Sequence, residues 1–143
     1  MDLNGKLEVT GRLQVVINGK LEKEFNNLVV DAGKEWVAGM MTNVGTVMTH
    51  MAVGTSTTVA SAGQTALVSE LDRNALTTAG GTLNANTVQF ACTWGDGDGE
   101  GALTEAGLFD NSAGGNMLAR TVFDVINKGS GDVMTIIWTI TVA

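Results

Sequence analysis

The residues best suited to chemistry form an acidic, glycine-rich stretch in the second half of the chain. Asp96, Asp98 and Glu100 alternate with glycines, and Gly101 follows. This spacing is typical of the first half of a calcium-binding loop. The bidentate glutamate that closes such a loop should then stand at position 107, which is Gly107. We interpret the stretch as an acidic turn between strands and keep the three carboxylates as candidate ligands for a weakly bound Ca²⁺ or Mg²⁺.

Few other residues offer catalytic groups, because the chain has one histidine, one cysteine and no tyrosine. His50 lies in the apolar stretch 48–51, where a packed or interface side chain is more common than a general base. Cys92 lies in an apolar stretch that is typical of a buried strand. The sequence has neither a phosphate-binding P-loop nor a G-x-S-x-G motif. We therefore predict that the chain is not an enzyme and has no cofactor; a hydrolase using Cys92 or His50 is the remaining alternative.

Composition excludes several classes of partner. Only 16% of the 143 residues are charged, and the net charge is -7. Five of the eight basic residues lie among the first 34 and alternate with acidic ones, so no basic stripe is available for nucleic acid. No run approaches the roughly 18 apolar residues of a membrane span, and no signal peptide is expected. The length favours a single domain over residues 1–143.

A β-hairpin is predicted over residues 1–30. Apolar residues alternate over 7–17, and a second strand is expected over 21–30. Asn18 and Gly19 between them are the residue types that a two-residue turn with positive φ requires. A short helix should follow over residues 31–42. Asp31 is a suitable N-cap, and apolar residues recur on one helical face at Trp36, Val37, Met40 and Met41.

The main β-domain is predicted over residues 46–143. Expected strands cover residues 46–53, 67–78, 87–94, 102–109, 117–126 and 133–142, with glycine-rich turns between the later ones. Residues 67–78 fit a strand or a helix, and we favour a strand; 55–64 is expected to be an exposed loop. The last strand is too apolar for an open edge, so it is either central or covered by a neighbouring subunit. This pattern predicts a mainly β fold: an antiparallel β-sandwich or barrel, jelly-roll-like, with an N-terminal hairpin and one short helix.

Several stretches of this chain resemble a pattern found in small structural proteins of tailed bacteriophages. These stretches are residues Thr49–Thr57, Thr65–Glu70, Gly101–Asp110, Met117–Phe123 and Lys128–Val142. The resemblance covers roughly residues 28–143. Two of the stretches read as adjacent strands, across which Glu105 and Arg120 could form an ion pair. The alternative is an exposed pair that contributes little to stability.

The resemblance implies a capsid decoration (cement) protein that binds the outer shell as an oligomer, with a trimer favoured, and stabilises it. Its partners would be other copies, the major capsid protein or other virion proteins, and its location the virion after synthesis in the host cytoplasm. The alternative role is a tail, baseplate or fibre-associated module, with contact to a receptor as one option within that role. The candidate interface residues are Lys6, Arg12, Lys20, Lys23 and Trp138. For Trp138 we favour a role as a core anchor, together with Trp36 and Trp94, and keep the interface role as the alternative.

Overall fold

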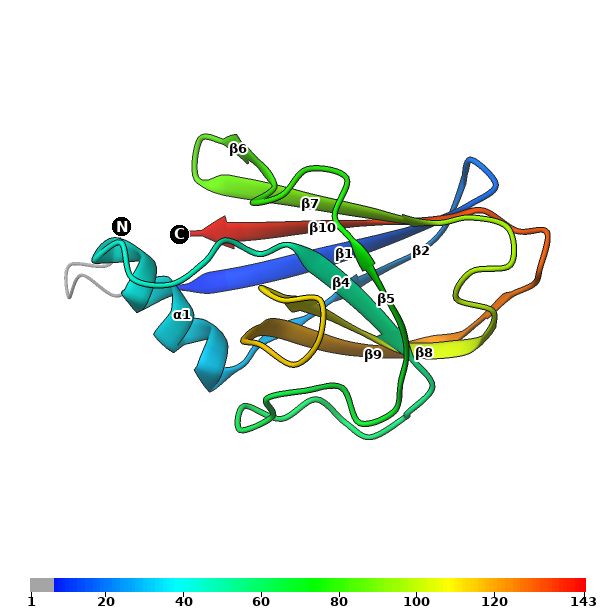
Figure 1. The fold of residues 1–143 in the computed structure, drawn as a ribbon, viewed down its shortest axis with the longest axis horizontal. Coiled ribbons are helices and arrows are strands. Elements are labelled where there is room, and N and C mark those ends of the chain that lie inside the picture. Colours follow the sequence, from blue (N-terminus) through cyan, green and yellow to red (C-terminus); the bar gives the residue numbers. More distant parts are fainter. Residues whose placement is uncertain (1–6) are drawn as a thin grey trace.

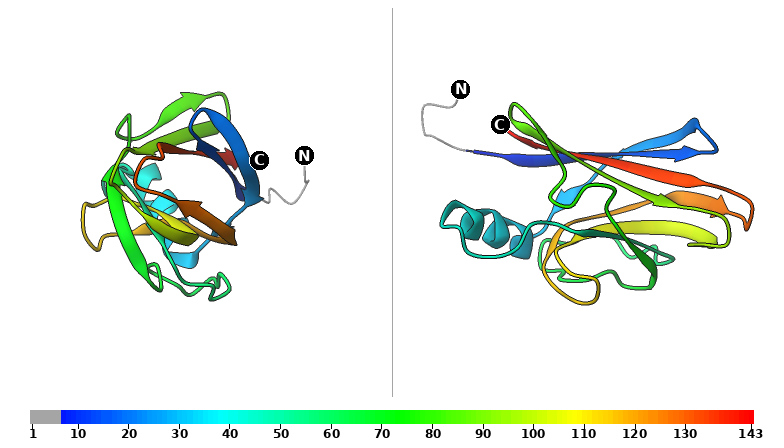
Figure 2. Two further views of the ribbon diagram at one scale, coloured as in Figure 1. Left: turned by 90° about the vertical axis from the view of Figure 1, so that its right-hand side faces the viewer. Right: turned by 45° about the horizontal axis from the view of Figure 1, so that its top comes forward.

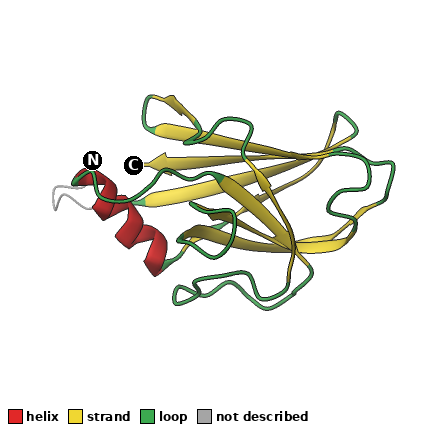
Figure 3. Ribbon diagram, viewed as in Figure 1, coloured by secondary structure: helices red, strands yellow, loops and turns green. Residues whose placement is uncertain are grey.

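In a computed structural model, residues 7–143 form two antiparallel five-stranded sheets packed face to face (Figure 1). The first sheet has the strand order β2-β1-β10-β7-β6, with bounds Lys20–Asn26, Val9–Ile17, Met134–Val142, Thr87–Trp94 and Thr82–Asn84. The second has the order β3-β9-β8-β4-β5, with bounds Leu28–Val29, Met117–Lys128, Gly101–Phe109, His50–Gly54 and Glu70–Ala75. The fold is therefore the predicted β-sandwich (Figure 3). No helix among the described residues is long and apolar enough to cross a membrane.

The N-terminal hairpin is confirmed, but its second strand is shorter than predicted. Asn18 and Gly19 have φ values of 51° and 81°, as the tight turn between β1 and β2 requires. At Asn27 the chain leaves the first sheet, and β3 pairs with β9 of the second sheet. The Asn27 amide donates to the Gly11 carbonyl at 3.2 Å, and a side chain at Gly11 would overlap the Asn27 side chain. The expected single strand over 21–30 is thus wrong, because the chain changes sheets at this contact.

Strand β10 is central, which settles the alternatives for the last strand. It pairs with β1 on one side and with β7 on the other. The pairing with β1 extends over the whole strand, from Met134 to Val142. Its inward side chains alternate with outward ones, and Trp138 is fully buried in the core between the sheets. Trp138 is therefore a core anchor, and its expected role as an interface residue is wrong for this fold.

One helix, α1 (Asp31–Met41), closes one end of the sandwich, as both views in Figure 2 show. The helix follows β3 directly, so Val30 occupies the N-cap position and Asp31 is the first helical residue rather than the predicted cap. The Asp31 carboxylate still lies near the positive end of the helix dipole. Gly33 is buried against the Leu118 carbonyl of β9, where a larger residue would collide with the backbone.

The remaining strands follow the predictions with local differences. The region predicted as strand 46–53 becomes a strand only at His50, because Thr46 lies beside the helix and accepts a hydrogen bond from the Trp36 indole at 2.7 Å. The ambiguous segment 67–78 contains strand β5. The short edge strand β6 was not predicted; all three of its residues are exposed.

Candidate functional site

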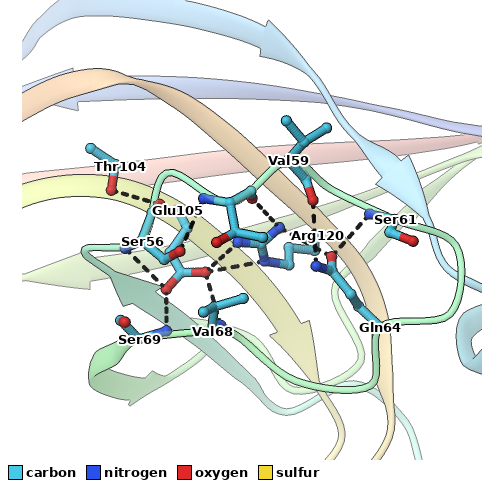
Figure 4. Close-up of polar contacts among 10 residues, drawn as sticks. Ser56, Val59, Ser61, Gln64, Val68, Ser69, Thr104, Glu105 and Arg120 are labelled. Atoms are coloured by element: carbon cyan, nitrogen blue, oxygen red, sulfur yellow. Dashed lines mark hydrogen bonds and ion pairs between the residues drawn. The ribbon is translucent and has the colours of Figure 1, made fainter.

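The most extensive buried polar cluster in the described chain centres on Glu105 of β8 and Arg120 of β9 (Figure 4). The Arg120 guanidinium donates to Glu105 Oε2 from Nη2 at 2.7 Å and from Nε at 3.1 Å, and both side chains are 0% exposed. Ala106 and Leu108 belong to the main core, so Glu105 projects from the opposite face of the sheet. The predicted ion pair is confirmed, and the exposed alternative is wrong.

Glu105 is buried because the segment 55–69 folds over this face of the second sheet. Its carboxylate accepts backbone hydrogen bonds from Ser69 at 2.7 Å, Val68 at 3.1 Å and Ser56 at 3.4 Å. The neighbouring Thr104 hydroxyl donates to the Ser56 carbonyl at 2.8 Å. One carboxylate therefore binds both ends of the segment.

Arg120 binds the middle of the same segment. Its Nη1 donates to the Thr58 carbonyl at 2.9 Å and to Gln64 Oε1 at 3.1 Å, and Gln64 Oε1 also accepts from the Ser61 amide at 3.0 Å. The segment predicted as an exposed loop is therefore fastened to the sheet by charge-assisted hydrogen bonds. Both charged side chains are closed to solvent, and their hydrogen bonds hold this segment against the sheet.

The acidic turn between β7 and β8 places its carboxylates differently from the prediction. Asp98 faces Asp72 of β5, and the Asn74 amide donates to Asp98 Oδ2 at 2.7 Å. Hydrogen bonds from Asp72 and Asn74 lower the pKa of Asp98, while burial and the proximity of Asp98 raise the pKa of Asp72. Within residues 7–143, no group of three or more His, Cys, Asp or Glu side chains is arranged to hold a metal ion. Asp96, Asp98 and Glu100 are therefore not brought together as ligands.

The other side of this turn is fixed by a buried lysine. The Lys128 ammonium, 2% exposed, donates to the Gly95 carbonyl at 2.8 Å, and the Gly97 amide donates to the Ser130 carbonyl at 2.8 Å. Gly97 also has a positive φ of 74°. These contacts describe a closed turn, consistent with the structural interpretation of the acidic stretch.

Cys92 and His50 do not form a nucleophilic site. Cys92 is fully buried in β7, and burial raises the pKa of its thiol to about 12. Its Sγ lies 3.4 Å from the Ala75 carbonyl. The thiol is therefore protonated at neutral pH, whereas nucleophilic cysteines need the thiolate. The half-buried His50 places Nδ1 2.8 Å from the hydroxyl of its neighbour Thr49.

The basic interface candidates lie on the hairpin surface. Arg12 pairs with Glu24 at 2.9 Å, and Lys23 lies 3.9 Å from Asp124, both at partly exposed positions. Lys20 is exposed beside the turn. Lys6 lies outside the described residues. The hairpin is thus a polar surface whose basic charges are partly neutralised within the chain.

The helix-capped end of the sandwich has a different character. A pocket of about 250 Å³ lies between α1 and the ends of both sheets, lined by apolar residues that include Trp36, Met40 and Ile140. Large apolar side chains nearby are exposed, among them Met41 and Leu83 at 75% each. The sequence alone did not identify this surface, because the residues that line the pocket come from several separate segments.

Searches of protein family models, of curated proteins and of solved structures each find no match to this chain.

Proposed function

We propose that this chain is a structural protein of a tailed-bacteriophage particle that decorates the outer capsid shell as an oligomer and stabilises it. The proposal rests on one observation: four of the phage-like stretches contribute residues to the buried Glu105–Arg120 cluster. Residues 49–57 contribute Ser56, residues 65–70 contribute Val68 and Ser69, residues 101–110 contribute Glu105, and residues 117–123 contribute Arg120. The pattern thus corresponds to a buried framework rather than to a reaction centre.

A framework of this kind suits a protein that acts by docking. Two clusters of buried hydrophobic residues stabilise the sandwich. The Glu105–Arg120 cluster adds hydrogen bonds that hold the segment 55–69 against the second sheet. Such a rigid domain loses little conformational entropy when it binds a partner. A protein that binds the assembled shell and not its dissociated subunits stabilises the shell by mass action.

The second candidate role is a tail, baseplate or fibre-associated module. It is favoured by the same resemblance, because similar stretches occur in proteins described as tail-fibre components. It takes second place because the sequence contains no stalk-forming repeat.

The test is to locate the protein on intact particles by cryo-electron microscopy or immunogold labelling. Decoration predicts copies distributed over the icosahedral shell, and particles lacking the protein should release their genome at lower temperature. Labelling confined to the tail would favour the second role. Absence from particles would refute the virion role in both forms.

A further inference from the structure

We propose that copies of this chain associate through the apolar end of the sandwich, at a surface that we call the helix-end patch. The patch is formed by Met41, Val44, Val47 and Leu83 around the pocket beside α1. This inference deepens the oligomeric part of the proposed function. It can be tested on the isolated protein, independently of any virion.

The patch is continuous across the end of the helix and the segment that follows. The Val44 amide donates to the Gly39 carbonyl at 2.9 Å, which holds the backbone of Val44 against the last turn of α1. Farther along, the Gly80 amide donates to the Met48 carbonyl at 2.8 Å, and the Val47 side chain lies over Gly80. The segment after the helix therefore links α1 to the turn that precedes β6.

Strand β6 extends the apolar inner face of the first sheet beyond its covered part. Leu83 pairs with Val88 of β7, and Val88 pairs with Ile140 of β10, so the three side chains form one row on the same face. Ile140 is 5% exposed, whereas Leu83 is 75% exposed. Residues of α1 line the pocket together with Val88 and Ile140, whereas Leu83 is not among the lining residues.

Charge favours a second copy as the occupant of this surface. The pocket lining contains no charged residue, and the chain is uncharged from Trp36 to Ser69 and from Asn74 to Gly95. The acidic turn at 96–100 and Asp132 lie at the opposite end of the strands (Figure 1). Two copies with a net charge of -7 each repel one another, and the repulsion is weakest where acidic residues are fewest.

Shape also favours self-association. The patch carries both a hollow of about 250 Å³ and protruding apolar side chains, of which Leu83 and Met41 are the most exposed. A surface that carries both protruding apolar side chains and an apolar hollow can bind the same surface of a second copy. Exposed contiguous apolar patches on soluble domains commonly mark interaction sites.

The experiment measures the molar mass of the full chain by light scattering over a wide concentration range. We expect the wild-type mass to reach a multiple of 14.8 kDa. Leu83→Asp should weaken association by at least about thirtyfold, the scale of an interface hot spot. Leu21→Asp is the matched control, because Leu21 is 50% exposed on β2 next to the hairpin turn, at the other end of the sandwich.

Salt provides a second readout. Added NaCl screens the repulsion between acidic copies, so association through the helix-end patch should be unchanged or stronger. An interface built on Arg12, Lys20 and Lys23 would instead weaken with salt. Circular dichroism of each variant verifies that the exposed substitution leaves the fold intact.

The inference is overturned if the wild type stays monomeric at every concentration, or if Leu83→Asp associates as well as the wild type. Loss of association in Leu21→Asp with retention in Leu83→Asp would move the interface to the hairpin. The molar mass is measured on the isolated protein and does not depend on whether the protein is found on particles. The two proposals can therefore be refuted separately.

Discussion

Replacing Glu105 with glutamine changes one oxygen atom to an amide group, yet the structure predicts a large loss of stability. Each carboxylate oxygen faces only donors. Oε1 accepts from the Ser69 and Ser56 amides, and Oε2 accepts from the Val68 amide and twice from Arg120. In either orientation the glutamine NH₂ would point at donors, and Arg120 would remain buried without its counter-charge. Breaking a buried ion pair in this way costs about 3–5 kcal/mol.

The assay is urea or thermal unfolding at neutral pH. A loss of about 3 kcal/mol lowers Tm by roughly 10 °C for a chain of this size. Glu24→Gln is the matched control, because Glu24 pairs with Arg12 at 2.9 Å and the two side chains are 38% and 56% exposed. An exposed pair contributes less than about 1 kcal/mol. The reasoning is refuted if Glu105→Gln unfolds within about 1 kcal/mol of the wild type, which is the loss expected of an exposed pair.

The double variant Glu105→Leu/Arg120→Met sharpens the test. Replacing a buried ion pair that makes no other hydrogen bonds with apolar residues is often neutral or stabilising. Here the Val68 and Ser69 amides and the Thr58 carbonyl would also lose their partners. The double variant should therefore remain less stable than the wild type by about 1–3 kcal/mol for each buried backbone group that finds no new partner.

Three further outcomes are expected. Cys92 should not react with a thiol reagent at pH 8 in the folded protein and should react in urea, because burial raises its pKa to about 12; fast labelling of the native protein would contradict this. Folding raises the pKa of Asp72, so its contribution to stability is present at low pH and is lost as pH rises from about 3.8 through the raised value. In urea titrations Asp72→Asn should thus gain stability over the wild type towards neutral pH and gain none in strong acid, and a pH-independent difference would refute the assignment. Gly33→Ala should destabilise by about 1–3 kcal/mol in thermal unfolding, because the methyl group would overlap the Leu118 carbonyl; helix propensity alone would give a stabilisation of up to about 1 kcal/mol.

Local sequence patterns predicted most of the strands but not the point where the chain changes sheets. The Asn18-Gly19 turn and the alternation in β1 depend on neighbouring residues alone, so both were correct. The break at Asn27 involves a contact with Gly11, sixteen positions earlier, and the only local signal for it is the pair Asn26-Asn27, a residue type that is depleted in strands. Strand β6 was missed because three residues are too few for an alternating pattern to be recognised.

The candidate site was predictable in part for the same reason. Glu105 and Arg120 were expected to pair because they stand on adjacent strands, but their burial was not predictable. The cover is the segment 55–69, whose small polar residues are typical of exposed loops. Asp72 was also missed as the neighbour of Asp98, because strands β6 and β7 lie between them in the sequence. Asp72 belongs to β5 of the second sheet, whereas Asp98 lies in the turn that follows β7 of the first sheet.

The central place of β10 has a consequence for how the chain folds during synthesis. The second sheet contains only strands that precede Ser130, so all of its strands are synthesised before β10. The first sheet cannot be completed until β10 has been synthesised, because β1 and β7 are joined only through β10. Until then the β1–β2 hairpin stands alone, and an isolated hairpin is only marginally stable in water. Chains interrupted before Met134 would therefore expose two unpaired apolar edges, which makes them prone to aggregation.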